Sequence, residues 1–237
     1  MIVVVGLAFE ARIAAGPGVR VVRRSDDDLA KTLSRALMPD CRGIVSFGVC
    51  GGLAPDLKPG DVVVASAILS GQGRIATDGP WSRRLLDRLP APAHGLLLGV
   101  PAPVADPALK RTLHEETGAI AVDMESHVVA DVAAACGLPM VAIRVVTDPA
   151  QRTIPHAALA AMGQNGSIDV IAMARSLLRR PRQVTGLMRT ALDARLAHLA
   201  LRRHRAALGP SLGSPYHHAA GAGLAPLATM EALQPAE

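Results

Sequence analysis

The stretch that decides the fold is GIVSFGVCGGLAP, residues 43–55. Its first five residues read as a buried strand, and the glycines that follow would let backbone N–H groups approach a ligand closely. A tight turn is the simpler interpretation of the same glycines. The stretch is not a dinucleotide fingerprint, because Pro55 and Pro59 stand where that motif needs a helix. Residues 43–55 therefore predict a strand that runs into a turn or a ligand-binding loop.

Apolar runs and helical patterns alternate on both sides of this stretch. Strands are expected at residues 2–5, 19–22, 43–47, 61–67, 95–98, 119–122 and 140–146, and helices at 28–37, 82–89, 107–117, 126–136 and 168–179. Continuous apolar strands separated by helices predict an α/β fold with a central mixed, mostly parallel sheet flanked by helices. Sheets of this kind bind ligands beyond the carboxyl ends of their strands.

The length of 237 residues favours one large domain over two small ones. We assign this domain to residues 1–180 and expect a basic C-terminal helix at 181–208. Residues 209–237 are rich in Gly, Pro, Ala, Ser and His, so we expect a disordered tail there. Half of the residues are hydrophobic but only 2% are aromatic, which predicts an aliphatic core.

The chain reads as a cytoplasmic protein without a metal. Its first residues, MIVVVG, form too short an apolar run for a signal peptide, and no window approaches the roughly 18 apolar residues of a membrane span. The cysteines at positions 41, 50 and 136 match no metal-ligand spacing and suggest no disulfide framework. The net charge is +5, and the scarcity of aromatic residues argues against nucleic acid as the partner of this charge.

The segments SFGVCGGLAP at 46–55 and LKPGDVV at 57–63 resemble the signature of the nucleoside phosphorylase/nucleosidase superfamily. The resemblance extends over residues 1–178. It implies an enzyme that cleaves the bond between a purine and its ribose, with no cofactor and with inorganic phosphate as a candidate co-substrate. It also implies that the glycine-rich segment contacts the substrate through Gly48, Val49, Cys50 and Gly51.

The segment AVDMES at 121–126 resembles the superfamily's E-M-E segment, with Asp123 in the first acidic place. The resemblance implies that Met124 packs under the sugar and that Glu125 accepts hydrogen bonds from the ribose hydroxyls. The chemistry agrees, because one carboxylate can accept from both the 2′-OH and the 3′-OH. The alternative is an acid at a helix N-terminus beside a core methionine.

The segment AIRVVTD at 142–148 resembles a family strand that ends in an aspartate, which donates a proton to N7 of the departing purine. General acid catalysis of this kind contributes about 10²–10⁴-fold, and Asp148 would need a raised pKa to perform it. A turn cap after a strand is the alternative. The segment GLAFEA at 6–11 resembles the family's first strand and loop, in which a glutamate activates water, and Glu10 is its only acid.

The sequence departs from the family pattern in three places. Ser46 and Val49 replace the arginine and serine with which some members hold phosphate, so a phosphate site would need backbone amides and a distant Arg23 or Arg24. The segment RRSDDD at 23–28 replaces a glycine-rich segment. Pro103 aligns near the aromatic residue that stacks on adenine in the nucleosidases. Hydrolysis and phosphorolysis therefore both stay open.

The opening VGLxxEARIA, the GVCGGL loop and the DMES segment together resemble the hopanoid-associated phosphorylase branch. That resemblance implies release of adenine from adenosylhopane by a homo-oligomer. A methylthioadenosine/adenosylhomocysteine-type nucleosidase is the alternative enzyme. A catalytically inactive nucleoside-binding sensor is the alternative of another class.

Residues 182–208 predict a basic helix with apolar residues broadly on one face: Val184, Leu187, Met188, Ala191, Leu192 and Leu199. Several arginines accompany a single acid, Asp193. Such a helix can lie on an anionic membrane, here the inner membrane face. The alternative is a helix packed on the domain or on a partner subunit with its arginines in solvent, which Arg195 and Arg202 within the apolar stripe favour.

Overall fold

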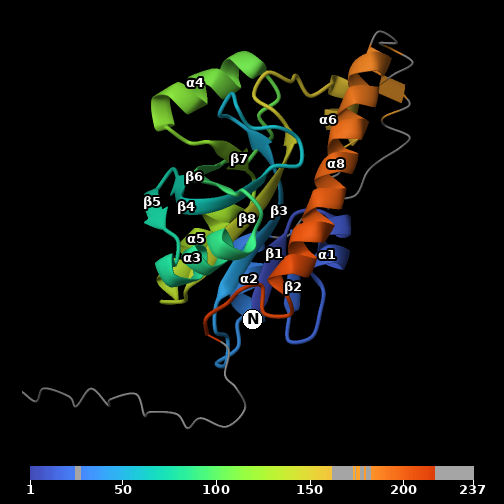
Figure 1. Cartoon of the computed structure of the whole chain (residues 1–237). Helices are drawn as coiled ribbons and strands as arrows, with labels where there is room; N and C mark the ends of the chain where they lie inside the picture. Colours follow the sequence, from blue (N-terminus) through green and yellow to red (C-terminus); the bar gives the residue numbers. More distant parts are fainter. Residues whose placement is uncertain (25–27, 162–172, 174, 177–178, 180–182, 217–237) are drawn as a thin grey trace, which may run out of the picture.

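The computed structural model describes residues 1–24, 28–161, 173, 175, 176, 179 and 183–216. Its strands are β1 (Ile2–Val5), β2 (Arg20–Arg23), β3 (Ile44–Gly52), β4 (Val62–Ser70), β5 (Gly73–Ala76), β6 (Ala93–Gly99), β7 (Ala121–Asp123) and β8 (Met140–Asp148). Its helices are α1 (Ala8–Ala14), α2 (Leu29–Ala36), α3 (Gly79–Arg88), α4 (Pro107–Thr117), α5 (Ser126–Ala135), α6 (His156–Ala161) and α8 (Val184–Leu208), as Figure 1 shows.

The strands form one sheet in the order β2-β1-β3-β7-β6-β4-β5, and β8 pairs with both β3 and β4. Pairings between β3, β8, β4, β6 and β7 close into a ring of strands. Pairing is parallel except between β3 and β7, β4 and β5, and β4 and β8. This arrangement confirms the expected mixed, mostly parallel sheet.

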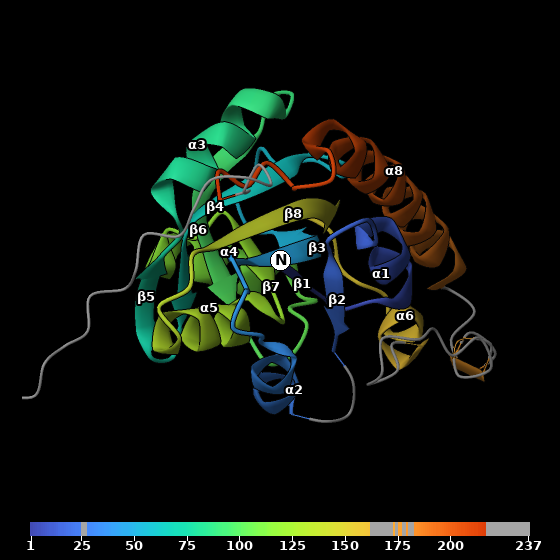
Figure 2. The ribbon, with the colours of Figure 1, turned by 90° about the horizontal axis from the view of Figure 1, so that it is seen from below.

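Helices cover the sheet on two sides, as the view from below shows (Figure 2). One apolar cluster joins α2 and α5 to the sheet, and a second joins α3 and α8 to it. The central strands are apolar on both faces because both faces are covered, and all four residues of β1 are buried. The strands β2 and β5, at the two ends of the strand order, are partly exposed. The core is aliphatic, as expected, apart from the buried Phe47 and Trp81.

Helix boundaries follow local capping chemistry. The side chains of Asp28, Asp78 and Asp106 accept hydrogen bonds from backbone amides in the first turns of α2, α3 and α4. Helix α4 begins with Pro107 and ends at Thr117, and the following Gly118 has a φ of 69°, the left-handed conformation that glycine adopts most easily.

Three elements were not expected from the sequence: α1, β5 and α6. Strand β3 also continues through the glycines to Gly52, because it stays paired with β8 to Gly51 and then with β7. The segment 48–52 is therefore strand rather than loop. The helix expected at 168–179 falls largely outside the described residues.

The C-terminal helix exists and packs on the domain, and the chain after it remains packed for several residues. Leu212 is fully buried, and its carbonyl accepts a hydrogen bond from Trp81 Nε1 at 2.9 Å. The expected disordered tail, 209–237, thus begins with an ordered segment, and residues 217–237 lie outside the described part. Within the described residues, no helix is long and apolar enough to cross a bilayer.

Candidate active site

A cavity of about 350 Å³ opens where β1, β3, β6, β7 and β8 end. Carboxyl ends of strands are the expected position for a ligand in such a sheet. Nine of the ten residues that the sequence singled out line this cavity: Glu10, Val49, Cys50, Gly51, Pro103, Asp123, Met124, Glu125 and Asp148. The tenth, Gly48, lies behind Glu10.

Glycines at the end of β3 make room for two acidic side chains. A Cβ atom at Gly48 would collide with Glu10 Oε1, and one at Gly51 would lie 3.1 Å from Asp148 Oδ2. The sequence interpretation gave these glycines to the ligand. In the structure, their absent side chains first allow Glu10 and Asp148 to stand on the two sides of the same strand end.

Glu10 lies on α1 and is buried, with its carboxylate held by backbone amides. Oε2 accepts from Gly6 N at 2.8 Å and Leu7 N at 2.7 Å, and Oε1 accepts from Val49 N at 2.8 Å. Burial raises the pKa of Glu10 to about 7, although Arg144 opposes the shift. A carboxyl group that titrates near neutral pH suits a general base.

Arg144 is a buried cation beneath the cavity. Its Nη2 lies 2.5 Å from Asp123 Oδ2 and 3.5 Å from Glu125 Oε2, and donates to Ser46 Oγ at 2.6 Å. Asp123 is also bonded by the Ser126 hydroxyl. The Asp123 carboxylate is therefore bound by Arg144 and Ser126 of the protein itself. It also balances the charge of the guanidinium that contacts Glu125.

Glu125 turns one oxygen toward Arg144 and the other toward Arg24. Arg24 Nη1 lies 3.4 Å from Glu125 Oε1, and a Cβ at Gly6 would lie 2.7 Å from that oxygen. Burial raises the pKa of Glu125, and Arg144 opposes this. Because Glu125 lines the cavity, its carboxylate oxygens can accept hydrogen bonds from a diol bound there.

Asp148 ends β8 and is paired with a buried lysine. Lys110 Nζ lies 2.5 Å from Asp148 Oδ2 and also donates to the backbone carbonyls of Pro149 at 3.1 Å and Arg152 at 3.3 Å. Burial raises the pKa of Asp148, and Lys110 opposes that shift.

The second oxygen of Asp148 has a neighbour that can serve either protonation state. Thr147 Oγ1 lies 2.7 Å from Asp148 Oδ1 and 3.1 Å from the Cys50 carbonyl. An ionised Asp148 accepts a hydrogen bond from Thr147 Oγ1, which lowers the pKa of Asp148. A protonated Asp148 can instead donate to Thr147 Oγ1, while the Thr147 hydroxyl donates to the Cys50 carbonyl. This geometry accommodates the acid form of Asp148.

The remaining walls are apolar. They are formed by Leu7, Val49, Cys50, Val100, Pro103, Val104, Val122, Met124, Ile154 and Leu159. Burial raises the pKa of the Cys50 thiol, so this group stays neutral and packs as an apolar side chain. Pro103 lines the cavity wall, and its contact with a base stays a prediction.

Residues 27–179 match the family described as the phosphorylase superfamily. The chain belongs to this superfamily. No similar sequence was found among curated proteins.

Several solved structures share the fold of this chain over most of its length. Native futalosine hydrolase of Helicobacter pylori has a TM-score of 0.64 at 13% identity, with 87% of this chain and 95% of that one covered. A 5′-methylthioadenosine/S-adenosylhomocysteine nucleosidase of the same organism has a TM-score of 0.58 at 17% identity, covering 86% and 96%. A putative nucleosidase of this kind from Francisella philomiragia has a TM-score of 0.60 at 13% identity, covering 87% and 95%. At these identities the likeness shows the fold.

Sequence reasoning gave no role to two buried cations of this superfamily member, Arg144 and Lys110. Arg144 lies within the quoted strand segment, and a single arginine inside an otherwise apolar buried run is the signal that could have found it. Lys110 gave no signal, because it lies 38 residues before Asp148 and only the fold brings α4 to β8.

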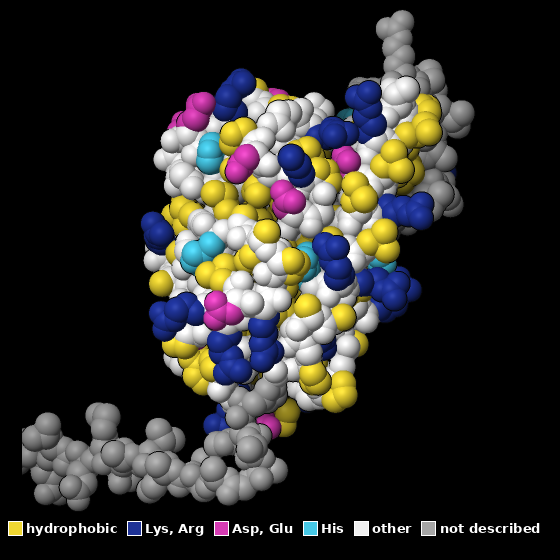
Figure 3. All heavy atoms as spheres, in the orientation of Figure 1, with side chains coloured by type: hydrophobic (Ala, Val, Ile, Leu, Met, Phe, Trp, Pro, Cys, Tyr) yellow, Lys and Arg dark blue, Asp and Glu magenta, His cyan; other side chains and the backbone are white. Residues whose placement is uncertain are grey.

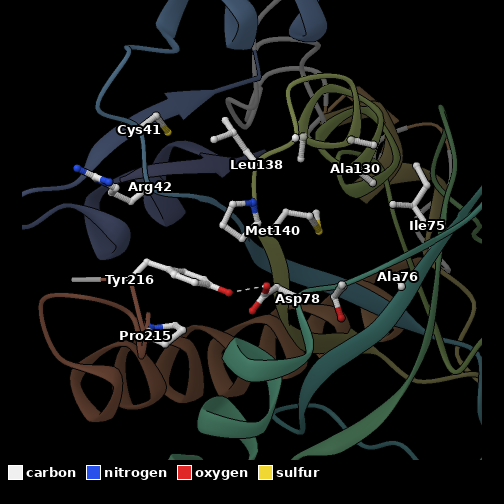
Figure 4. Close-up of a pocket in the computed structure, with 15 residues that line it drawn as sticks. Cys41, Arg42, Ile75, Ala76, Asp78, Ala130, Leu138, Met140, Pro215 and Tyr216 are labelled. Carbon is white, nitrogen blue, oxygen red and sulfur yellow. Dashed lines mark hydrogen bonds between the residues drawn. The ribbon is translucent and has the colours of Figure 1, made fainter. Parts of the chain in front are cut away.

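A larger hollow of about 850 Å³ lies at the opposite end of the sheet, where β8 begins (Figure 4). Its walls come from the segment before β3, the end of β5, α5 and the chain after α8. Asp78, its acid, already accepts a hydrogen bond from Tyr216 Oη at 2.7 Å. The smaller cavity holds the clustered carboxylates and is the better candidate for chemistry. Among the described residues, no three potential ligands converge on a metal position.

Proposed function

We propose that the chain cleaves the N-ribosidic bond of a purine nucleoside. The observation that carries the proposal is the convergence of three carboxyl groups on one cavity at the carboxyl ends of the strands: Glu10 and Glu125, which are buried, and Asp148, which is partly buried. Membership of the phosphorylase superfamily supports the same reaction class.

Each carboxyl group has a distinct part in this proposal. Asp148 donates a proton to N7, so that adenine leaves as a neutral base while positive charge develops on the ribose. Glu125 accepts hydrogen bonds from the ribose hydroxyls. Glu10 takes a proton from the attacking water in those enzyme molecules in which it is ionised, a fraction that grows as the pH rises through its pKa of about 7.

Hydrolysis is favoured over phosphorolysis by the contacts of Glu10. A phosphate bound without side-chain donors would need backbone amides, and those of Gly6, Leu7 and Val49 already donate to the Glu10 carboxylate. Of the described residues that line the cavity, Arg24 is the only cation, and it already faces Glu125. An inorganic phosphate would meet carboxylates and one shared arginine.

The substrate in this proposal is an adenosine with an apolar 5′ substituent, such as adenosylhopane. The apolar walls, including Ile154 and Leu159 beyond the end of β8, support an apolar substituent. A methylthioadenosine/adenosylhomocysteine-type nucleosidase is the second candidate. We also propose that the chain forms a homo-oligomer, and that this oligomer works in the cytoplasm in contact with the inner membrane face.

Product analysis with and without phosphate tests the reaction. We expect free adenine and a free ribosyl product from 5′-substituted adenosines in phosphate-free buffer. A strict phosphate requirement with ribosyl 1-phosphate as product would replace hydrolysis by phosphorolysis. No adenine release from any substrate, with tight nucleoside binding, would show that the chain is a nucleoside-binding sensor.

A further inference from the structure

Helix α8 packs on the sheet by one narrow face. The buried residues of this helix are Asp193, Ala197, Ala200, Leu201, His204 and Leu208. At roughly 100° per residue they fall within an arc of about 100°. The remainder of the helix lies at the edge of the molecule, where Figures 1 and 2 both place it outside the sheet.

The outward face of α8 has an apolar stripe. It consists of Val184, Met188, Leu192, Leu196 and Leu199, which are 44%, 64%, 59%, 53% and 51% exposed. These five residues fall within an arc of about 120°, so they form one continuous strip along four turns. Large apolar side chains gathered in this way mark an interaction surface, whereas scattered ones do not.

The stripe is accompanied by positive charge. Arg189, Arg195, Arg202 and Arg203 are exposed on the same side of the helix. The acid of α8, Asp193, is turned inward and pairs with Arg152 at 3.1 Å. Figure 3 shows basic and hydrophobic side chains intermingled along this edge.

A basic pocket of about 670 Å³ adjoins the stripe, between α1 and α8. Arg12, His198, Arg202 and Arg205 line it together with apolar and backbone atoms. Arg205 is held in place because its Nε donates to the Ala14 carbonyl at 3.2 Å and its Nη1 to the Gly209 carbonyl at 2.6 Å. Arginine groups gathered in a concave site are suited to a phosphate group.

We propose that the outward face of α8 is a contact surface for an anionic lipid bilayer. The apolar stripe enters the interface, the exposed arginines meet the anionic headgroups, and the pocket between α1 and α8 receives a lipid phosphate. A basic helix with an apolar face is the usual form of such a contact. The inference concerns binding alone and does not depend on the proposed reaction.

Charge favours a bilayer over a second copy of the chain. A twofold contact of α8 with α8 would bring the arginines of one helix toward those of the other, and this helix offers no outward acid to compensate. An anionic bilayer supplies that compensation. It also accepts the apolar stripe, which a nucleic acid backbone would not.

The position of α8 also relates the surface to the cavity. Helix α6 provides Leu159 to the cavity wall, and Ala157 N of the same helix donates to Gln183 Oε1, beside the start of α8, at 3.0 Å. The bilayer contact would therefore lie next to the rim of the cavity.

Flotation of the full chain with vesicles tests the surface. We expect binding to vesicles of phosphatidylcholine and phosphatidylglycerol, weaker binding at high salt, and little binding to phosphatidylcholine alone. Arg195→Glu with Arg202→Glu should lower the partition coefficient at least about fivefold for each charge reversed. Leu192→Glu with Leu196→Glu should also lower the partition coefficient, although every arginine of α8 is kept. Leu192→Ser is a milder change of the same stripe and should lower the partition coefficient even if the double variant fails to fold.

Matched controls lie on other helices. Leu109→Glu changes an exposed leucine of α4, and Arg83→Glu with Arg84→Glu reverses exposed arginines of α3. These controls should float like the unchanged chain. Equal flotation of stripe variants and controls, no flotation at all, or a dimer in solution that the stripe variants dissolve would each overturn the proposal.

Discussion

Glu10→Gln should lower turnover. It should also raise the free energy of unfolding relative to the unchanged protein as the pH rises. Burial raises the pKa of Glu10 from 4.5 to about 7, so the folded state holds its proton more tightly than the unfolded chain does. The stabilisation from this proton is complete below pH 4.5 and is lost as the pH rises through 7. Glutamine has no proton to lose, so the variant should escape this loss.

The magnitude follows from the shift. One pKa unit corresponds to about 1.4 kcal/mol, so the full loss is about 3 kcal/mol, of which about 2.5 kcal/mol falls between pH 5 and pH 8. The amide also loses one acceptor toward the Gly6, Leu7 or Val49 amides. That cost is the same at every pH, so the change in the difference between the two proteins isolates the titration of Glu10.

Denaturant unfolding at pH 5 and pH 8 measures this difference. We expect the free energy of unfolding of Glu10→Gln, relative to the unchanged protein, to rise by about 2.5 kcal/mol between these pH values. Glu116→Gln, at an exposed position of α4, is the matched control and should show no such change. Turnover of Glu10→Gln should fall by about 10²–10⁴-fold. A pH-independent difference would refute the burial argument, and retained turnover would refute the role as base.

Three further predictions concern the other charged groups of the cavity. Asp148→Asn should keep nucleoside binding and lose most turnover, about 10²–10⁴-fold, in steady-state kinetics with a binding assay; a loss of only a fewfold would exclude the acid role. A 2′-deoxy substrate should react poorly with the unchanged enzyme, and Glu125→Gln should narrow the gap between ribo and deoxy substrates; equal rates with the unchanged enzyme would exclude the ribose contact. Lys110→Met removes the cation that opposes the raised pKa of Asp148, so the pH at which kcat/KM declines on the alkaline side should rise. An unchanged profile in a folded Lys110→Met protein would show that Lys110 does not control Asp148.

The sequence was sufficient for seven of the eight described strands, because most of these are buried and read as apolar runs. It missed β5, which is partly exposed along its whole length. The resemblance to the superfamily was sufficient to name nine residues that line one cavity, and that cavity lies where the carboxyl ends of several strands meet. The short helix α1 was missed, since seven residues give little periodicity. The roles of these residues stay predictions until turnover is measured.

The charges that balance the cavity could not be predicted, because balance is a property of packing. Lys110 is paired with Asp148, 38 residues further along the chain. Arg144 interacts electrostatically with Asp123, Glu125 and Glu10, which come from separate parts of the chain. The sequence analysis included Leu187 in the apolar face of the C-terminal helix and left out Leu196. In the structure Leu187 is half-buried and Leu196 is exposed, because the packing of the helix on the sheet decides which side chains face outward.

The place of β8 in the ring of strands has a consequence for biogenesis. This strand is the last of the sheet to be synthesised, yet it lies between β3 and β4, which leave the ribosome about 70 to 100 residues earlier. Until β8 arrives, both earlier strands present unpaired edges, which are templates for aggregation. Folding must therefore keep a gap open for a late strand, and a nascent chain halted before residue 140 should be among the best clients of a chaperone.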